Sequence, residues 1–315
     1  MRGQAAAAPL RHFTDVSALP VEDLQRILSE AARRKQARGG LARGQRDADR
    51  PLDGHVLATL FAHPSTRTRV SMDMAMHQLG GRALELPAAN LQTGRGESLA
   101  DTARVLSTYV DAISFRARRH ADLLELTEAA QVPVINALTD RSHPCQSLAD
   151  VLTLAECFGD VSQLTVAWIG DGNNVLLSLL EAAAAFGFAV RLCCPAGRQV
   201  NEARLGALRD RGARLEIVDE PAQAARGVQA IYTDTWVSMG DALDDREAVF
   251  GPYRVDAAVM AAAAPEAVFL HCLPAHRGEE VSAEVLDGPQ AAVWQQAENR
   301  LHAQKAIILY CLGWL

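Results

Sequence analysis

Short apolar runs alternate with longer segments of helical periodicity along most of the chain. This alternation predicts parallel α/β sheets, because parallel neighbouring strands need a crossover helix between them. In the first half of the chain we expect four strands, at Val56–Phe61, Ala83–Leu86, Ala112–Phe115 and Val132–Asn136. In the second half we expect five, at Thr165–Ile169, Ala189–Cys193, Arg214–Val218, Ala230–Thr233 and Val268–His271.

Helical spacing of apolar residues occupies the intervals between these strands. The expected helices are, in chain order, Val70–Met76, Ser98–Val110, Ser147–Cys157, Leu177–Phe186, Arg204–Arg211 and Ala297–Leu312. A length of 315 residues indicates two domains, which we place at residues 1–150 and 151–296. We expect a bridging helix at Ser147–Cys157, residues 297–315 packed back on the first domain, and a surface loop at Arg38–Arg50.

Composition argues against several classes of protein. Hydrophobic residues make up 49% of the chain, yet no apolar run approaches the roughly 18 residues of a membrane span. The formal net charge of -7 argues against nucleic acid as the main partner. Residues 1–9 lack the apolar core of an export signal. The six cysteines have no CxxC spacing and no HExxH motif occurs, so we expect reduced thiols in a cytoplasmic protein without metal or cofactor.

Polar motifs follow the carboxyl ends of the predicted strands. They are Ser65–Arg69, Arg116, His143–Gln146, Gly170–Asn174, Asp234–Gly240 and His271–Pro274. Ligands of open α/β sheets bind at this edge of the sheet. The sequence therefore predicts a cleft between the two domains, lined by polar residues from both.

The segment Ser65-Thr66-Arg67-Thr68-Arg69 places hydroxyls and guanidiniums between a strand and a helix. Free N–H groups and the helix dipole favour an anion at a helix start, and arginine matches phosphate oxygens with a planar fork. The segment has no P-loop lysine or glycine spacing, so it is not a Walker motif. Taken alone, it is equally well explained as a capped, solvated helix start.

The other motifs also allow two interpretations each when they are taken singly. Arg116 either caps a strand at the surface or meets an anion, and His143 and Gln146 either lead into a helix or bind a carbonyl or amide group. Asp234 either belongs to an ordinary polar loop or offers a carboxylate to an ammonium group. Cys272 is either a buried thiol or part of a site.

Four motifs together resemble the aspartate/ornithine carbamoyltransferase family. They read Ser-Thr-Arg-Thr-Arg, His-Pro-Cys-Gln, Asp-x-x-x-Ser-Met-Gly and His-Cys-Leu-Pro, and the similarity extends from about Arg11 to Leu312. The resemblance implies two doubly wound parallel-sheet α/β domains with the active site in the cleft between them, assembled as a homotrimer. It also implies transfer of the carbamoyl group of carbamoyl phosphate to the δ-amine of L-ornithine, giving L-citrulline and phosphate in arginine biosynthesis and related metabolism.

The resemblance further implies roles for the residues at matching positions. The carbamoyl phosphate site would consist of Ser65, Thr66, Arg67, Thr68, Gln92, Arg116, His143, Gln146, Cys272, Leu273 and Arg300, with Gln92 lent by a neighbouring subunit. The ornithine site would consist of Asn174, Asp234, Ser238 and Met239. Of these, Arg116, His143, Asp234 and Cys272 would act in catalysis.

Two positions depart from the family pattern. His63 stands where members commonly carry a lysine, and the loop after Gln92 reads Thr93-Gly94-Arg95-Gly96 where some members carry a lysine before the glutamate. Ligand contacts at these two points are therefore left unassigned.

Other functions fit part of the pattern. Aspartate carbamoyltransferase would need cations in its acceptor site in place of Asp234, while carbamoyltransferases of N-acylated ornithine or putrescine would share the phosphate cluster. A non-enzymatic anion-binding protein would keep that cluster without needing Asp234 and Cys272. A nucleotide-binding oxidoreductase would need a glycine fingerprint after Ile169, which is missing.

Overall fold

Two parallel sheets organise the chain in the computed structural model, which describes residues 9–63, 65–87, 96–236 and 245–315. The first sheet has the strand order β2-β1-β3-β4, with β1 Val56–Phe61, β2 Arg82–Pro87, β3 Ala112–Arg116 and β4 Val134–Leu138. The second has the order β7-β6-β5-β8-β9, with β5 Thr165–Ile169, β6 Ala189–Cys193, β7 Arg214–Ile217, β8 Ala230–Thr233 and β9 Val268–His271. Every neighbouring pair is parallel, which confirms the predicted fold class.

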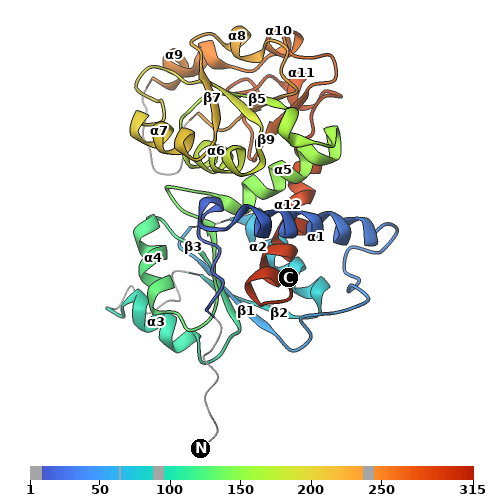
Figure 1. The fold of residues 1–315 in the computed structure, drawn as a ribbon, viewed down its shortest axis with the longest axis vertical. Helices are drawn as coiled ribbons and strands as arrows, with labels where there is room; N and C mark the ends of the chain where they lie inside the picture. The colour runs from blue at the N-terminus through green and yellow to red at the C-terminus, as the bar shows by residue number, and fades with distance from the viewer. Residues whose placement is uncertain (1–8, 64, 88–95, 237–244) are drawn as a thin grey trace, which may run out of the picture.

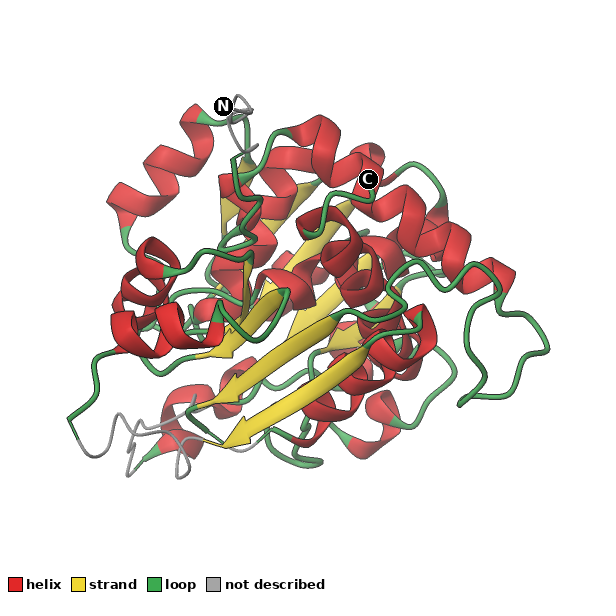
Figure 2. Cartoon of the chain, turned by 90° about the horizontal axis from the view of Figure 1, so that it is seen from below, coloured by secondary structure: helices red, strands yellow, loops and turns green. Residues whose placement is uncertain are grey.

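Helices cover both faces of the sheets (Figure 2). The first domain contains α1 Val21–Ala37, α2 Thr66–Leu79, α3 Leu99–Leu106 and α4 His120–Ala129, and α5 Pro144–Phe158 leads to the second. The second contains α6 Asn174–Phe186, α7 Glu202–Asp210, α8 Pro221–Ala225, α9 Arg246–Phe250, α10 Ala257–Ala261 and α11 Ala283–Leu286, and α12 Val293–Cys311 ends the chain. Alternate residues of the strands enter different cores, as in β5, where Trp168 and Ala167 belong to two separate apolar clusters.

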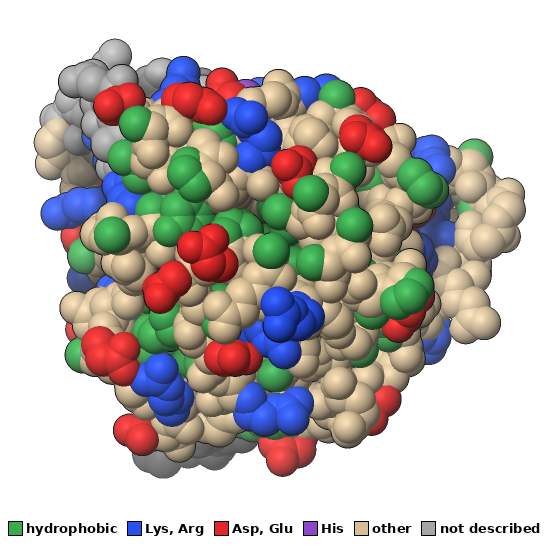
Figure 3. Space-filling model, turned by 90° about the horizontal axis from the view of Figure 1, so that it is seen from above, with side chains coloured by type: hydrophobic (Ala, Val, Ile, Leu, Met, Phe, Trp, Pro, Cys, Tyr) green, Lys and Arg blue, Asp and Glu red, His purple; other side chains and the backbone are tan. Residues whose placement is uncertain are grey.

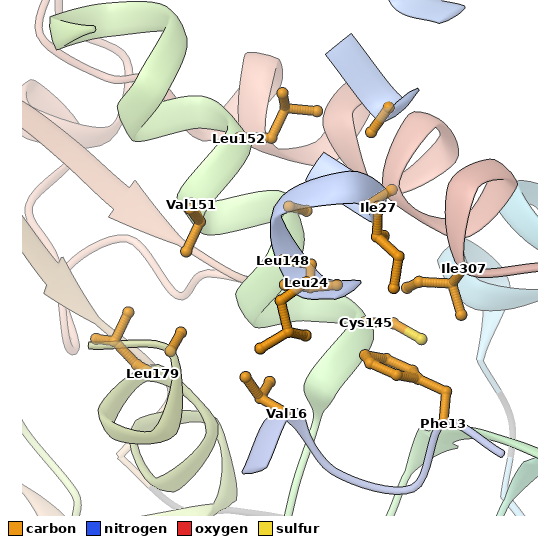
Figure 4. Close-up of a cluster of buried hydrophobic side chains, with 14 of the residues drawn as sticks. Phe13, Val16, Leu24, Ile27, Cys145, Leu148, Val151, Leu152, Leu179 and Ile307 are labelled. Atoms are coloured by element: carbon orange, nitrogen blue, oxygen red, sulfur yellow. The ribbon is translucent and has the colours of Figure 1, made fainter. Parts of the chain in front are cut away.

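One apolar core is shared by the two domains. Figure 4 shows side chains from the N-terminal segment, α1, α5, α6 and α12 in contact, namely Phe13, Val16, Leu24, Ile27, Cys145, Leu148, Val151, Leu152, Leu179 and Ile307. Each large aliphatic side chain buried in this way contributes about 1.5–3 kcal/mol. The shared core therefore fixes how the domains lie relative to each other, with α5 and α12 passing between them (Figure 1).

Helix α12 also makes polar contacts with both domains. Near its start, Gln296 Oε1 accepts a hydrogen bond from the backbone N–H of His271 in β9 at 2.9 Å. Farther along, Lys305 Nζ donates to Gln78 Oε1 of α2 at 3.1 Å, and Tyr310 donates to Asp23 of α1 at 2.8 Å. The C-terminal helix thus runs from the second sheet to the first domain.

Several predicted helix boundaries were wrong: α3 ends at Leu106, four residues before the predicted Val110, and α12 begins at Val293, four residues before the predicted Ala297. Helices α2, α5 and α6 begin at Thr66, Pro144 and Asn174, one turn before the predicted Val70, Ser147 and Leu177. Polar residues lie in or just before these first turns, where the backbone N–H groups are free. A hydrophobic pattern does not record such residues. Strand β4 begins at Val134, two residues after the predicted start, because Pro133 has no N–H to donate to a ladder.

Charged side chains of both signs are interspersed on the face shown in Figure 3. Among the described residues, no helix combines the length and the hydropathy needed to cross a membrane.

A buried ion cluster anchors α12 to the segment after α1. Lys305 is completely buried, and its Nζ lies 2.6 Å from Asp47 Oδ2. Asp47 is the one buried residue of the predicted surface loop at residues 38–50, which is otherwise exposed or half-buried, and it also accepts from Arg34 at 2.8 Å and Arg38 at 2.7 Å. Burial lowers the pKa of Lys305 to about 8, so the ammonium depends on the carboxylate of Asp47.

We predict that Asp47→Ala lowers the free energy of unfolding by about 3–5 kcal/mol, because it leaves the buried ammonium of Lys305 without its carboxylate and removes one partner each from Arg34 and Arg38. Lys305→Met is the matched control, since it removes the buried ammonium while Asp47 keeps both arginines. Lys305→Met should lower the free energy of unfolding by less than half as much as Asp47→Ala. Urea denaturation of both variants measures the difference, and a larger loss for Lys305→Met would contradict this account.

Candidate functional site

The predicted site lies where the strand order of each sheet reverses. In the first sheet the reversal falls between β1 and β3, and in the second between β5 and β8. Crevices form at the carboxyl ends of strands at such points, and ligands bind there. One cavity of about 770 Å³ lies at these strand ends, and its walls include Ser65, Arg67, Arg116, His143, Asn174, Asp234, Cys272, Leu273 and Arg300.

The first turn of α2 forms one wall of this cavity. Ser65 is the N-cap, and its hydroxyl accepts from the backbone N–H of Thr68 at 3.4 Å. Thr68 is buried, and its hydroxyl accepts from Arg300 Nη2 at 2.8 Å, which ties α12 to the start of α2. Arg67, in the same turn, is exposed to the cavity. A helix N-terminus with two guanidiniums beside it is suited to a phosphate group.

Arg116 brings a third guanidinium to the same wall. It ends β3, and the pairing with β4 shifts register between Phe115 and Arg116, as strands do where a side chain is re-aimed. Burial, then the charges of Arg300 and Arg67, lower the pKa of Arg116 to about 10. The group stays charged at neutral pH, but the repulsion shows that placing these cations side by side is energetically unfavourable. A bound anion would offset that cost.

His143 lies among the three guanidiniums. Burial and the charges of Arg300, Arg116 and Arg67 hold its pKa well below the usual value, so the imidazole is neutral at pH 7. Its backbone N–H donates to Ser178 Oγ of α6 at 2.7 Å. Within the described part of the chain, Nδ1 is buried without a hydrogen-bond partner. A neutral imidazole has one donor and one acceptor nitrogen available for a ligand.

The opposite wall comes from the second domain. Asp234 follows β8 and is buried, and its carboxylate accepts from Asn173 Nδ2 at 2.7 Å and from Cys272 Sγ at 3.0 Å. Burial, then Asp234, hold the pKa of Cys272 well above its usual value, so the side chain is a thiol at neutral pH. Asn174 Nδ2 donates to the carbonyl of Thr139 at 2.6 Å, which connects this wall to the first domain.

The turn after β9 is held by a buried histidine. Leu273 N–H donates to His271 Nδ1 at 2.8 Å, so the other ring nitrogen carries the proton and faces Glu280 Oε1 at 3.2 Å. Leu273 has a φ of 59°, a left-handed conformation that a leucine adopts only when its surroundings enforce it. This bonding holds the backbone between Cys272 and Pro274 against the cavity.

Two groups of side chains place possible metal-ligand atoms within 4.8 Å of one another in the described part of the chain. The first is Asp234, His271 and Cys272, and the second is His276, Glu279 and Glu280. In the first group the thiol donates to the carboxylate and the imidazole is engaged on both sides. We therefore describe it as a hydrogen-bonded cluster.

Some predicted site residues lie elsewhere. Thr66, Thr68 and Gln146 are not among the residues that line the cavity; Thr68 accepts from Arg300 and Gln146 donates to Asp150. Gln92, Ser238 and Met239 lie outside the described residues, as does the departure at Arg95. The predicted list of site residues did not include five titratable residues that also line the cavity, namely His63 (noted only as a departure), Arg118, Asp140, Asp171 (part of the predicted Gly170–Asn174 motif) and Arg198. Their position just after β1, β3, β4, β5 and β6 was the available signal.

We predict that Asp234→Asn speeds the alkylation of Cys272 by iodoacetamide at pH 8. Removing the neighbouring negative charge lowers the pKa of the thiol, and a shift of one unit gives about tenfold more thiolate. Peptide mass spectrometry measures the rate, with the exposed Cys157 of the same molecule as internal control. An unchanged ratio of the two rates would show that the Asp234 charge does not reach the thiol.

Comparison with known proteins agrees with this arrangement. Residues 11–156 match the family model of the aspartate/ornithine carbamoyltransferase carbamoyl-P binding domain, and residues 162–311 match that of the Asp/Orn binding domain. The chain is 52% identical over 304 residues to the ornithine carbamoyltransferase of Rhizorhabdus wittichii, covering 96% of this chain and 98% of the relative. It is also 52% identical over 305 residues to that of Brucella ovis, covering 96% of each.

A solved structure has the same fold over nearly its whole length. The ornithine carbamoyltransferase from Pyrococcus furiosus superposes with a TM-score of 0.91 at 42% identity, covering 97% of this chain and 98% of that one. The motifs in their order, the two parallel sheets and both family models agree. The chain belongs to the aspartate/ornithine carbamoyltransferase family.

Proposed function

We propose that this protein is an ornithine carbamoyltransferase, which carbamoylates the δ-amine of L-ornithine with carbamoyl phosphate and acts in arginine metabolism in the cytoplasm. One observation carries the proposal: the facing reversal points of the two sheets place a cluster of guanidiniums opposite the Asp234–Cys272 pair in one cavity. The first wall suits an acyl phosphate and the second suits an amine. The names of the relatives support the same pair of substrates.

Carbamoyl phosphate would bind against α2. Its phosphate would accept hydrogen bonds from the N-terminal turn at Ser65–Thr68, and Arg67 would neutralise its charge. The carbonyl oxygen would face Arg116 and His143, which are held in place before the substrate arrives. Donors fixed in this way stabilise the negative charge that grows on that oxygen in the transition state.

Ornithine would approach from the second domain. Its neutral δ-amine attacks the carbonyl carbon, a C–N bond forms, and the C–O bond to phosphate breaks. The donor is already activated by its phosphate leaving group, so the protein needs no covalent nucleophile. Asp234 and Cys272 would orient the amine. By resemblance, Asn174, Ser238 and Met239 would hold the rest of the amino acid. Proximity in one cavity lowers the barrier further.

Assembly is part of the proposal. By resemblance, three copies would form a closed ring in which Gln92 completes the cavity of a neighbouring subunit. The site of each subunit would then depend on its neighbour as well as on its own chain.

The direct test offers carbamoyl phosphate with L-ornithine, aspartate, N-acetylornithine or putrescine in separate assays and identifies the carbamoylated product by mass spectrometry. We expect citrulline from ornithine at a kcat/KM well above that of the other three acceptors. Preference for another acceptor would reassign the second wall, and no product with any of them would refute carbamoyl transfer.

We predict that Arg67→Ala lowers kcat/KM for carbamoyl phosphate by more than about a hundredfold without unfolding the protein, because no neighbouring group replaces a guanidinium at the reacting phosphate. Arg69→Ala is the matched control from the same helix, since Arg69 is paired with Glu85 at 2.6 Å and does not line the cavity. Equal effects of the two substitutions would contradict the phosphate assignment.

We also predict that two inactive variants complement each other. Arg116→Ala spoils the site of its own chain, whereas Gln92→Ala spoils the site next door if the loop is shared. Refolding the two together should give about one intact site in four, with random mixing in a closed ring. Activity equal to the sum of the separate variants, in a sample shown to contain mixed trimers, would place Gln92 in its own chain's site.

A further inference from the structure

Asp150 lies on α5 one turn after Gln146 and is completely buried. Its carboxylate accepts three hydrogen bonds from neutral donors. Gln146 Nε2 lies 2.8 Å and Gln296 Nε2 lies 2.7 Å from Oδ1, and the hydroxyl of Tyr232 lies 3.1 Å from Oδ2. These donors come from α5, α12 and β8, so one carboxylate connects the two domains.

A buried carboxylate is a costly way to connect the two domains. Burial raises the pKa of Asp150 to about 7, although its three hydrogen bonds and Arg300 act in the opposite direction. An apolar side chain of similar volume would fill the space without that desolvation cost. A buried acid held by three neutral donors therefore calls for a role beyond packing.

The carboxylate determines how two side-chain amides are turned. Because Oδ1 of Asp150 accepts from both amides, Gln146 and Gln296 both present their NH₂ groups to it. The oxygen of Gln296 then accepts from the backbone N–H of His271 at 2.9 Å, at the end of the strand that leads to Cys272. The oxygen of Gln146 is turned the other way, and it is buried without a hydrogen-bond partner among the described residues.

Gln146 lies in the first turn of α5, three residues after the cavity-lining His143, and is itself just outside the cavity lining. A buried, unpaired carbonyl oxygen at this position is an acceptor for an N–H donor of a ligand. Carbamoyl phosphate carries such a donor in its NH₂ group, whereas the isosteric acetyl phosphate carries a methyl group. A site that hydrogen-bonds a substrate NH₂ rejects the analogue that lacks it, because its own polar group is then left unpaired.

We propose that Asp150 is a positioning residue that holds the amide oxygen of Gln146 toward the NH₂ of the carbamoyl group, and that it thereby makes the site select carbamoyl over acetyl phosphate. The same carboxylate, through Gln296, holds the end of β9 that leads to Cys272. This inference rests on the proposed function, since it takes a carbamoyl group as the occupant.

A double-mutant cycle tests the proposal. Asp150→Leu, Gln146→Ala and the double variant are compared with the wild type, with kcat/KM for carbamoyl phosphate and calorimetric affinities for carbamoyl and acetyl phosphate as readouts. Asp150→Leu should lower kcat/KM roughly ten- to a hundredfold and reduce the preference for carbamoyl phosphate by a similar factor. In the Gln146→Ala background the same change should cost less than about threefold, because its target is gone.

Two further variants separate positioning from simple damage. Asp150→Asn should stay within about fivefold of wild type, since its amide oxygen accepts from both glutamines and its NH₂ faces the Tyr232 hydroxyl. Tyr232→Phe removes the third donor without touching either glutamine, so the preference for carbamoyl over acetyl phosphate should not change. If Asp150→Leu does not fold, Asp150→Ser takes its place in the cycle.

Three results would overturn the proposal. The first is a double variant in which the two losses in kcat/KM simply add. The second is an unchanged preference between the two phosphates in Asp150→Leu, and the third is an Asp150→Asn variant as impaired as Asp150→Leu. Failure of the proposed function gives a different result. A wild-type protein that binds carbamoyl phosphate in preference to acetyl phosphate but carbamoylates no acceptor would refute the transferase, while the cycle measured by binding would still test Asp150.

Discussion

Three guanidiniums, those of Arg67, Arg116 and Arg300, converge at one end of the first sheet and line the cavity. Their mutual repulsion is the main electrostatic constraint on this wall. They come from α2, β3 and α12, so the fold must bring distant parts of the chain together to create an unfavourable cluster. Burial and these neighbouring charges lower the pKa of Arg116 and keep His143 neutral. A dianionic ligand relieves the repulsion between the guanidiniums, and this relief contributes to its binding free energy.

The contacts that hold the two domains together are made by the same segments that form the cavity. His143 N–H bonds to Ser178, Asn174 bonds to the carbonyl of Thr139, and Tyr232 bonds to Asp150, and each pair joins one domain to the other. Beneath them, the shared apolar core supplies the stability. Buried polar bonds add little net free energy, but they allow only one relative placement of the domains, which is what a cavity built from two walls requires.

The strands could be predicted closely, and the buried polar residues could not. Strands β5 and β8 match their predicted bounds, because parallel strands buried on both faces appear as short apolar runs. Helix α1 was not predicted, since its buried residues are spread among many charges, and the first turn of α2 resembled a loop because it is polar. Cavity-lining residues such as Arg116 and Asp234 could be predicted because strand ends converge by topology, whereas Arg300 was expected only from the family resemblance. The burial of Asp150 and Lys305 depends on partners far away in the sequence, which no local pattern contains.

The protonation states of the cavity bear on where the reaction's proton goes. His143 is held neutral by burial and by three cations, so adding a proton to it is costly, and Cys272 is held as a thiol by burial and by Asp234. Neither group is therefore a good final acceptor for the proton that ornithine loses. The departing phosphate is a better one, because breaking the C–O bond leaves the electron pair and a negative charge on a phosphate oxygen, which then takes up a proton. In the proposed reaction, the product itself removes the proton, and the protein's acids and bases serve to position the amine.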